Sequence, residues 1–240
     1  MLELEISYYT QESKKITVPK KIIMLSDLHN VEYEHIVDAV LDEKPDIITV
    51  VGDVVDRHRK TYSRALGFLE SLSRIAPTFF SFGNHEVKFD VLSEDDIENT
   101  GAVLLDNSYV KYGEMVIGGH TPSKDFSWVD DFERREEFKL LLCHQPEHYK
   151  KYLRYRNIDL TLSGHAHGGQ WRPFGIPIFA PGQGLFPPYT SGFYEGKLVV
   201  GRGLSDVRAI PRLFNPIEIV VIEVEPKKDD TRDFIRYYNR

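Results

Sequence analysis

Five short apolar runs, each followed directly by polar residues, constrain the fold of this chain more than any other feature. Residues 47–51 show the pattern most clearly, because this β-branched run ends in Gly52, Asp53 and, three residues further on, Asp56. Runs of this length and composition are typical of buried strands. The four other runs are residues 22–25 before Asp27 and His29, 78–82 before Asn84 and His85, 140–143 before His144, and 160–163 before His165 and His167. In open α/β sheets, ligands bind beyond the carboxyl ends of the strands, so these polar side chains can converge on one pocket.

Amphipathic segments separate the first three runs and predict the order strand, helix, strand, helix, strand. Residues 34–43 and 62–75 each place apolar side chains on one helical face, and a proline follows each segment. A shorter helix is expected over residues 93–99, with Ser93 as its N-cap. Residues 2–8 alternate between apolar and polar, which is typical of a half-exposed strand at the edge of a sheet.

The pattern changes after residue 102. Short strands around turn residues are expected over residues 103–105, 109–112 and 115–118, which indicates a second sheet or an antiparallel extension of the first. A helix is expected over residues 146–154, and strands return at 197–201 and 218–224. We therefore predict one α/β domain over residues 1–240, built as a four-layer α/β/β/α sandwich of two mixed sheets flanked by helices.

Residues 171–194 are rich in glycine, proline and aromatic residues. Their side chains could wall a cleft for an aromatic base or an acyl chain. Loop packing is the commoner use of such residues, and we expect it for most of the set. The set consists of Trp171, Phe174, Phe179, Phe186, Pro187, Pro188, Tyr189, Phe193 and Tyr194.

Composition and charge limit the classes of partner. The net charge of −7 provides no general attraction for nucleic acid or anionic membranes, so we expect no stable nucleic-acid partner. Cys143 is the single cysteine, which excludes an internal disulfide framework. The N-terminus has no basic segment before an apolar one, and no apolar run approaches the ~18 residues of a membrane span. We expect a cytoplasmic protein without a transmembrane segment.

Seven side chains at the strand ends have the chemistry of metal ligands. They are Asp27, His29, Asp53, Asn84, His144, His165 and His167, and they offer nitrogen and oxygen atoms but no sulfur. This mixture suits Mn²⁺, Fe, Zn²⁺ or Ni²⁺ better than Ca²⁺ or an all-oxygen Mg²⁺ site. We expect two ions, with Mn²⁺ favoured and Asp53 between them. Two metal ions about 3.5–4 Å apart can clamp a phosphoryl group and generate hydroxide from water near neutral pH.

These motifs, in this order, resemble the five motifs of the calcineurin-like metallophosphoesterase superfamily over residues 21–168. The resemblance implies one metal held by Asp27, His29, Asp53 and His167, and a second held by Asp53, Asn84, His144 and His165. It further implies that His85 assists the leaving group, that Asp56 orients His85, and that Arg57 contacts phosphate. Residues 164–170 and 201–204 are similar to those of bacterial YkuE-type phosphodiesterases.

The motifs therefore favour an enzyme that uses two metal ions to cleave a phosphodiester or pyrophosphate bond by attack of a metal-bound hydroxide. Its substrate would be a small molecule, a nucleotide or a lipid conjugate, with diesters preferred over monoesters. A protein phosphatase or a nuclease on the same scaffold is the alternative. A non-catalytic metal-binding module is a third hypothesis, against which the complete set of ligands argues. The sequence favours no particular oligomeric state.

Overall fold

The computed structural model describes residues 3–56, 62–89, 92–206 and 212–228. Its first sheet is mixed. The strand order in this sheet is β1 (Leu4–Ser13), β14 (Ile217–Pro226), β2 (Lys20–Leu25), β3 (Ile47–Val51), β4 (Thr78–Ser81) and β5 (Val103–Leu104). Strands β2 to β5 are parallel, whereas β14 runs antiparallel to β2 and parallel to β1. The expected edge strand at the N-terminus is confirmed, since β1 has one neighbour in the sheet.

The second sheet is also mixed, and it packs face to face on the first. Its strand order is β12 (Gly192–Tyr194), β13 (Leu198–Val200), β9 (Leu160–Ser163), β8 (Phe138–Cys143), β7 (Met115–His120) and β6 (Ser108–Tyr112). The four inner strands are parallel, and the two outer strands are antiparallel to their neighbours. A separate hairpin of β10 (Phe179–Ala180) and β11 (Gly184–Leu185) lies outside both sheets.

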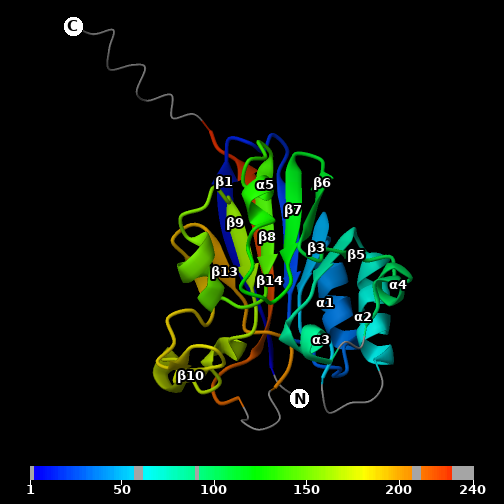
Figure 1. Cartoon of the computed structure of the whole chain (residues 1–240). Helices are drawn as coiled ribbons and strands as arrows, with labels where there is room; N and C mark the ends of the chain where they lie inside the picture. Colours follow the sequence, from blue (N-terminus) through cyan, green and yellow to red (C-terminus); the bar gives the residue numbers. More distant parts are fainter. Residues whose placement is uncertain (1–2, 57–61, 90–91, 207–211, 229–240) are drawn as a thin grey trace, which may run out of the picture.

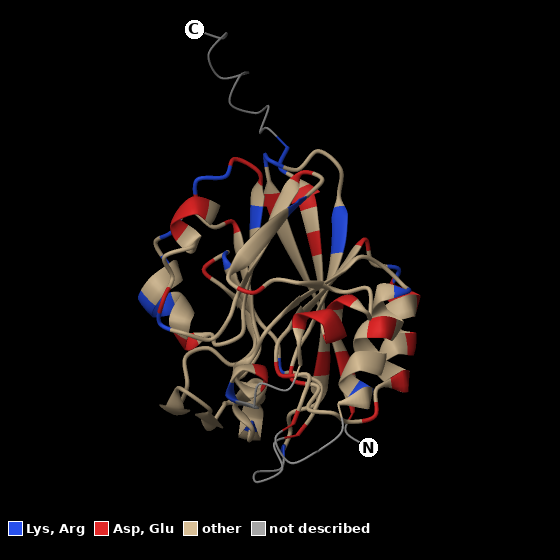
Figure 2. Ribbon diagram, turned by 45° about the vertical axis from the view of Figure 1, so that its right-hand side comes forward, with Lys and Arg blue, Asp and Glu red and all other residues tan. Residues whose placement is uncertain are grey.

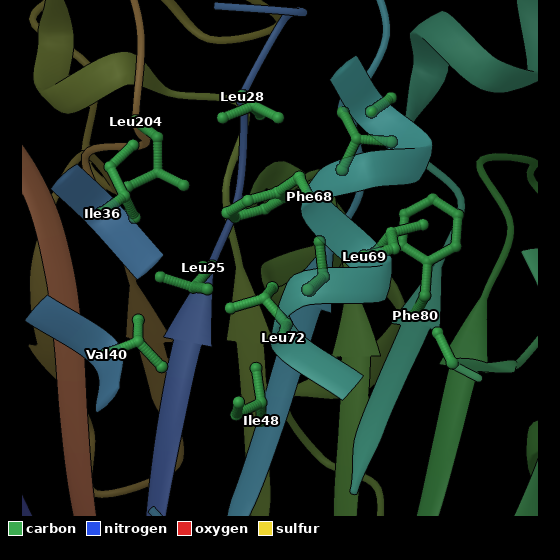
Figure 3. Packing of buried hydrophobic residues seen from close by; sticks show 14 of the residues in the cluster. Leu25, Leu28, Ile36, Val40, Ile48, Phe68, Leu69, Leu72, Phe80 and Leu204 are labelled. Carbon is green, nitrogen blue, oxygen red and sulfur yellow. The ribbon is translucent and has the colours of Figure 1, made fainter. Parts of the chain in front are cut away.

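Helices cover the outer faces of both sheets, which confirms the four-layer sandwich. Figure 2 shows helices on either side of the two sheets. Helices α1 (Glu34–Glu43) and α2 (Ser63–Ser73) pack on the first sheet, while α5 (Val129–Phe132) and a π-helical turn at Tyr149–Leu153 pack on the second. In Figure 3, Ile36 of α1 and Phe68 of α2 point toward Leu25 and Ile48 on the strands. A separate apolar core fills the space between the two sheets.

Local signals agree with the helix boundaries. Helix α1 has the expected limits and ends at Lys44, which adopts a left-handed conformation. Ser93 caps α4 (Glu94–Glu98), and its side chain and that of Asp96 each accept a hydrogen bond from the other's backbone N–H. The helix expected over residues 146–154 is correct in position but is π-helical over Tyr149–Leu153.

The three short strands expected after residue 102 divide between the two sheets. Strand β5 pairs with β4 and extends the first sheet, whereas β6 and β7 form an antiparallel pair in the second. Helix α3 (Asn84–Phe89) was not expected, because its first residues belong to a polar motif rather than to an amphipathic pattern. Helix α3 nevertheless positions Asn84 and His85 at the carboxyl end of β4.

Candidate metal centre

The carboxyl ends of five strands from both sheets meet at one edge of the molecule. Figure 1 shows the end of β8, helix α3 and the β10 hairpin at this lower edge. Backbone hydrogen bonds join the loops there, since Asp27 N donates to Gly52 O at 3.0 Å and His29 N donates to Asp53 O at 3.1 Å. The two motifs of the first sheet are therefore held together before any ligand binds.

The two carboxylates of this edge lie among imidazole rings. Asp27 Oδ1 lies 3.4 Å from Nε2 of His167 and 3.9 Å from Nε2 of His29. Asp53 Oδ2 lies 3.3 Å from Nε2 of His144 and 3.9 Å from Nε2 of His29. These distances place Asp53 between rings that come from different sheets.

Ligand atoms within 4.8 Å of one another form three overlapping groups in the described part of the chain. These groups are Asp27 with His29 and His167, Asp53 with His144 and His165, and Asp53 with His29 and His85. The first two groups match the two ligand sets that the sequence motifs imply, except that the first group lacks Asp53 and the second lacks Asn84. Asn84 begins helix α3, and its Oδ1 is buried.

Several buried nitrogen and oxygen atoms of this centre have no hydrogen bond, which is consistent with a cation-binding site. Among the described residues, three ligand atoms lack a hydrogen-bond partner: Nε2 of His29, Nε2 of His144 and Oδ1 of Asn84. Nδ1 of His29 donates to Val55 O at 3.2 Å, and Nδ1 of His144 donates to Val51 O at 2.7 Å. Because Nδ1 of each ring donates to a carbonyl, Nε2 is the nitrogen that faces the carboxylates and would bind a metal ion, which is the arrangement of metal-binding histidines. A nitrogen and oxygen donor set of this kind fits transition-metal ions.

Five of the candidate ligands have strained backbones. Asp27, His29, Asp53, His165 and His167 all have positive φ angles, between 45° and 65°. Such conformations cost about 1–3 kcal/mol each, and they cluster at functional sites. The strain turns consecutive side chains of each loop toward the same point instead of to opposite sides.

Two glycines lack the side chain that would otherwise collide with the carboxylates. A Cβ atom at Gly83 would lie 2.2 Å from Oδ1 of Asp53, and a Cβ atom at Gly164 would lie 2.5 Å from Oδ2 of Asp27. Neither position can carry a side chain without displacing a carboxylate. The glycine in each motif is therefore explained by close approach.

The electrostatics favour charged carboxylates. Burial alone would raise the pKa of Asp27 and of Asp53, but the nearby imidazoles outweigh it and lower the pKa of both. Burial likewise disfavours a charged His144, yet Asp53 outweighs it and raises the pKa of His144 to about 10. Burial lowers the pKa of His165 to about 4 and that of His167 to about 3. Without metal, the proton on His144 thus offsets part of the carboxylate charge.

Comparison with known proteins agrees with this arrangement. The family model described as calcineurin-like phosphoesterase matches residues 20–169. The chain belongs to the calcineurin-like phosphoesterase family. Its relatives include an uncharacterized metallophosphoesterase of Campylobacter jejuni, which is 28% identical over 233 residues, or 87% of this chain and 60% of the relative. The chain thus spans about 60% of the length of that relative and of the Helicobacter pylori proteins it matches.

Two shorter relatives match over most of their length. The metallophosphoesterase YkuE of Bacillus subtilis is 27% identical, with 85% of this chain and 79% of the relative covered. The phosphodiesterase YaeI of Escherichia coli is 29% identical, with 88% of this chain and 84% of the relative covered. The resemblance inferred from the motifs is confirmed. Every helix in the described ranges is too short or too polar to span a membrane.

Proton release on metal binding is a first expectation for this site. With a pKa of about 10, His144 carries a proton at neutral pH, and a metal ion must displace that proton to reach Nε2. Raising the pH toward 10 removes the competing proton, so Mn²⁺ affinity should rise by up to about tenfold per pH unit. Calorimetric titrations between pH 7 and pH 9, in buffers of different ionisation enthalpy, measure the number of protons released. An unchanged proton count in His144→Gln would contradict this assignment.

Glu86 is a site residue to which the sequence assigned no role. It is 3% exposed, and its carboxylate accepts hydrogen bonds from the backbone N–H groups of Asp53 at 2.8 Å, Gly83 at 2.7 Å and Val55 at 3.1 Å. Burial and the charge of Asp53 raise the pKa of Glu86, and the three N–H donors oppose this shift. The side chain therefore fixes the strained loop that carries Asp53.

Replacing Glu86 with Gln should weaken metal binding without removing a ligand. The amide retains a single acceptor oxygen for three N–H groups, so at least one bond is lost. Outer hydrogen-bond partners of metal ligands typically contribute about 10–100-fold to affinity, and we expect a Mn²⁺ affinity loss in that range. Competition with a chelator of known affinity measures the change. Glu94→Gln, on the exposed helix α4, is the control, and an equal effect in both variants would contradict the positioning role.

Two residues beyond the matched motifs also hold the site. The Arg212 guanidinium lies 3.4 Å from Nδ1 of His167, and its Nε donates to Ser205 O at 2.9 Å. Asn215 Nδ2 donates to His167 O at 2.8 Å. Both side chains are buried and follow His167 by more than 40 residues, so no local pattern could have linked them to it.

The remaining predicted residues have different positions. The side chain of His85 is 23% exposed, and its Nε2 lies 3.9 Å from Oδ2 of Asp53, so it lies at the solvent-facing edge of the site. Asp56 is 8% exposed, whereas Arg57 lies outside the described residues. Of the aromatic-rich set, Pro187 and Tyr189 are buried, as loop packing requires. Five members are exposed, so loop packing accounts for fewer of them than expected: Trp171, Phe174, Phe179, Phe186 and Pro188.

Proposed function

We propose that this phosphoesterase binds two divalent transition-metal ions, with Mn²⁺ favoured, and hydrolyses a phosphodiester or pyrophosphate bond. The position of Asp53 carries the proposal. Its Oδ2 lies 3.3 Å from the His144 ring of one group and 3.9 Å from the His29 ring of the other. A carboxylate in this position suits a bridge between two ions. Each group also contains a buried nitrogen or oxygen without a hydrogen bond.

Each metal ion would have its own ligands from the chain. Asp27, His29, Asp53 and His167 would hold one ion, and Asp53, Asn84, His144 and His165 would hold the other. Two such ions would neutralise phosphoryl charge and lower the pKa of water. His85, at the solvent-facing edge of the site, would donate a proton to the departing oxygen. Asp56 would orient the His85 ring, and Arg57 would contact the phosphate.

Several observations support a diester or pyrophosphate substrate of small size. A relative described as a phosphodiesterase, YaeI, is 29% identical and covers 88% of this chain. The acidic balance of the chain, with 37 Asp and Glu against 30 Lys and Arg, disfavours a nucleic acid. A small molecule, a nucleotide or a lipid conjugate is then the substrate class we infer.

Metal titration tests the dinuclear assignment. Protein stripped with a chelator and saturated with Mn²⁺ should approach two ions per chain, with diesterase activity appearing as the second site fills. A maximum of one ion per chain, with all seven ligands intact, would refute it. Bis-p-nitrophenyl phosphate, p-nitrophenyl phosphate, dinucleotides, nucleotide sugars and a phosphoprotein form the substrate panel. A higher kcat/KM for the monoester or the phosphoprotein would refute the diester preference.

A further inference from the structure

Exposed apolar side chains gather beside the candidate metal centre. More than half of the exposed large apolar residues in the described ranges belong to residues 171–186 and 213–214. Isolated exposed apolar residues are normal, but a contiguous group on a soluble protein marks an interaction surface. We call this group the apolar rim, and its main members are Trp171, Phe174, Ile176, Leu185, Phe186 and Phe214.

Backbone hydrogen bonds place the segments of the apolar rim side by side. Trp171 pairs with Leu213, and Arg172 N donates to Leu213 O at 2.9 Å. Ile178 N donates to Trp171 O at 3.0 Å, and Phe186 N donates to Ile178 O at 2.9 Å. The segments around residues 171, 178, 186 and 213 are therefore neighbours. The β10 hairpin and the adjacent loops form the lower corner of the molecule in Figure 1.

Three phenylalanines of the apolar rim are both exposed and strained. Phe174, Phe186 and Phe214 are 101%, 70% and 80% exposed, and their φ angles are 54°, 51° and 54°. Bulky residues rarely adopt this left-handed conformation, which glycine tolerates without strain. Phe174 is fully exposed and the two other rings are mostly exposed, so the described residues offer them little compensating contact. A contact with an external surface would offset this strain.

The charge pattern of the apolar rim fits a lipid surface. Residues 171–194 contain no Asp, Glu or Lys, and Arg172 is their single charged residue, in a chain with 37 acidic residues. The Arg172 guanidinium donates to Gly168 O at 2.8 Å and to Ser191 Oγ at 2.9 Å. Burying a carboxylate in an apolar medium is costly, and anionic headgroups repel it. Protruding aromatic side chains on a segment that contains no acidic residues of its own are typical of surfaces that insert into the membrane interface.

We propose that the apolar rim docks on a lipid bilayer and holds the candidate metal centre against the headgroups. The rim begins four residues after His167, and Asn215, next to Phe214, donates to His167 O. The loops that carry the exposed rings therefore also fix a candidate ligand. Docking would present phosphoesters of lipid headgroups to the site. This catalytic consequence rests on the proposed function, whereas the docking itself does not.

Vesicle binding by the full chain tests the proposal without requiring activity. The wild-type protein should float with phosphatidylcholine vesicles containing phosphatidylglycerol, and Trp171 fluorescence should shift to the blue. The variant Phe174→Ser/Phe186→Ser/Phe214→Ser should lose about 1000-fold or more in partitioning, since each of the three buried rings contributes about tenfold or more. Phe174→Ser alone replaces a fully exposed ring and should show a loss of about tenfold without a folding defect.

Exposed residues elsewhere provide the matched control. Tyr155, Leu41 and Val18 are 91%, 56% and 56% exposed and lie outside the apolar rim, so their combined replacement by Ser should leave vesicle binding unchanged. Hydrolysis of soluble bis-p-nitrophenyl phosphate should be equal in the wild-type protein and the rim variant. If the wild-type protein and both variants showed no diesterase activity while the wild-type protein still bound vesicles, the proposed function alone would be refuted. Absence of vesicle binding, or self-association abolished by the rim substitutions, would overturn the bilayer assignment.

Discussion

Asp53→Asn should remove most of the hydrolytic activity and reduce metal content more than Asp27→Asn does. The oxygen of Asp53 belongs to two groups of potential ligands, whereas that of Asp27 belongs to one. Loss of the Asp53 charge should therefore loosen both ions. Each metal ion contributes several kcal/mol to transition-state stabilisation. At 1.36 kcal/mol per factor of ten, the loss in kcat/KM should be at least about 10³-fold.

The two variants form a matched pair. Each replaces a buried carboxylate with an amide of the same shape, and each removes one negative charge. In Asp53→Asn, the retained Oδ1 can still accept the hydrogen bond from His85 N, which is 2.8 Å long in the wild-type structure. Metal content after gel filtration and kcat/KM for bis-p-nitrophenyl phosphate provide the measurements. Equal losses of metal and rate in both variants would argue against a bridging Asp53.

The sequence predicted the strands and the candidate ligands for the same physical reason. Buried parallel strands are mostly apolar, so the polar residues that follow an apolar run mark its end, as Ser26 and Asp27 do after β2 and His144 does after β8. Ends of neighbouring parallel strands must then meet. What the pattern could not predict is which sheet a short strand joins. The apolar runs that give β5 and β6 follow each other closely in the sequence, and their pairing depends on contacts distant in sequence.

Supporting residues escaped sequence reasoning because their partners are backbone groups. Glu86 binds N–H groups of two loops, and Asn215 binds the carbonyl of His167. Neither contact requires a particular residue type at the other end, so no pairing of side chains is visible in the sequence. Aromatic residues present a similar problem, since Phe186 and Tyr189 are three residues apart but 70% and 8% exposed. The backbone conformation, not hydrophobicity, decides which ring faces outward.

His85→Ala should slow diesters with alkyl leaving groups far more than those with p-nitrophenolate. The His85 ring lies at the solvent-facing edge of the site. Burial lowers the pKa of His85 against the opposing effect of Asp53, so its imidazolium is a stronger acid than that of free histidine. Proton transfer by such a group typically contributes about 10²–10⁴-fold, and alkoxides require it more than p-nitrophenolate does. Paired kcat/KM values for methyl p-nitrophenyl and dialkyl phosphodiesters measure this selectivity.

The metal content of His85→Ala decides whether His85 donates a proton or binds a metal ion together with His29 and Asp53. Nε2 of His85 lies within 4.8 Å of ligand atoms of His29 and Asp53, a spacing that a metal ion could also use. The alanine variant keeps the backbone N–H that donates to Asp53, so only the ring is lost. Two ions should remain bound, and Asp56→Asn should show the same selectivity more weakly, since Asp56 only orients the ring. Loss of one ion, or an equal rate decrease for both leaving groups, would exclude His85 as the general acid.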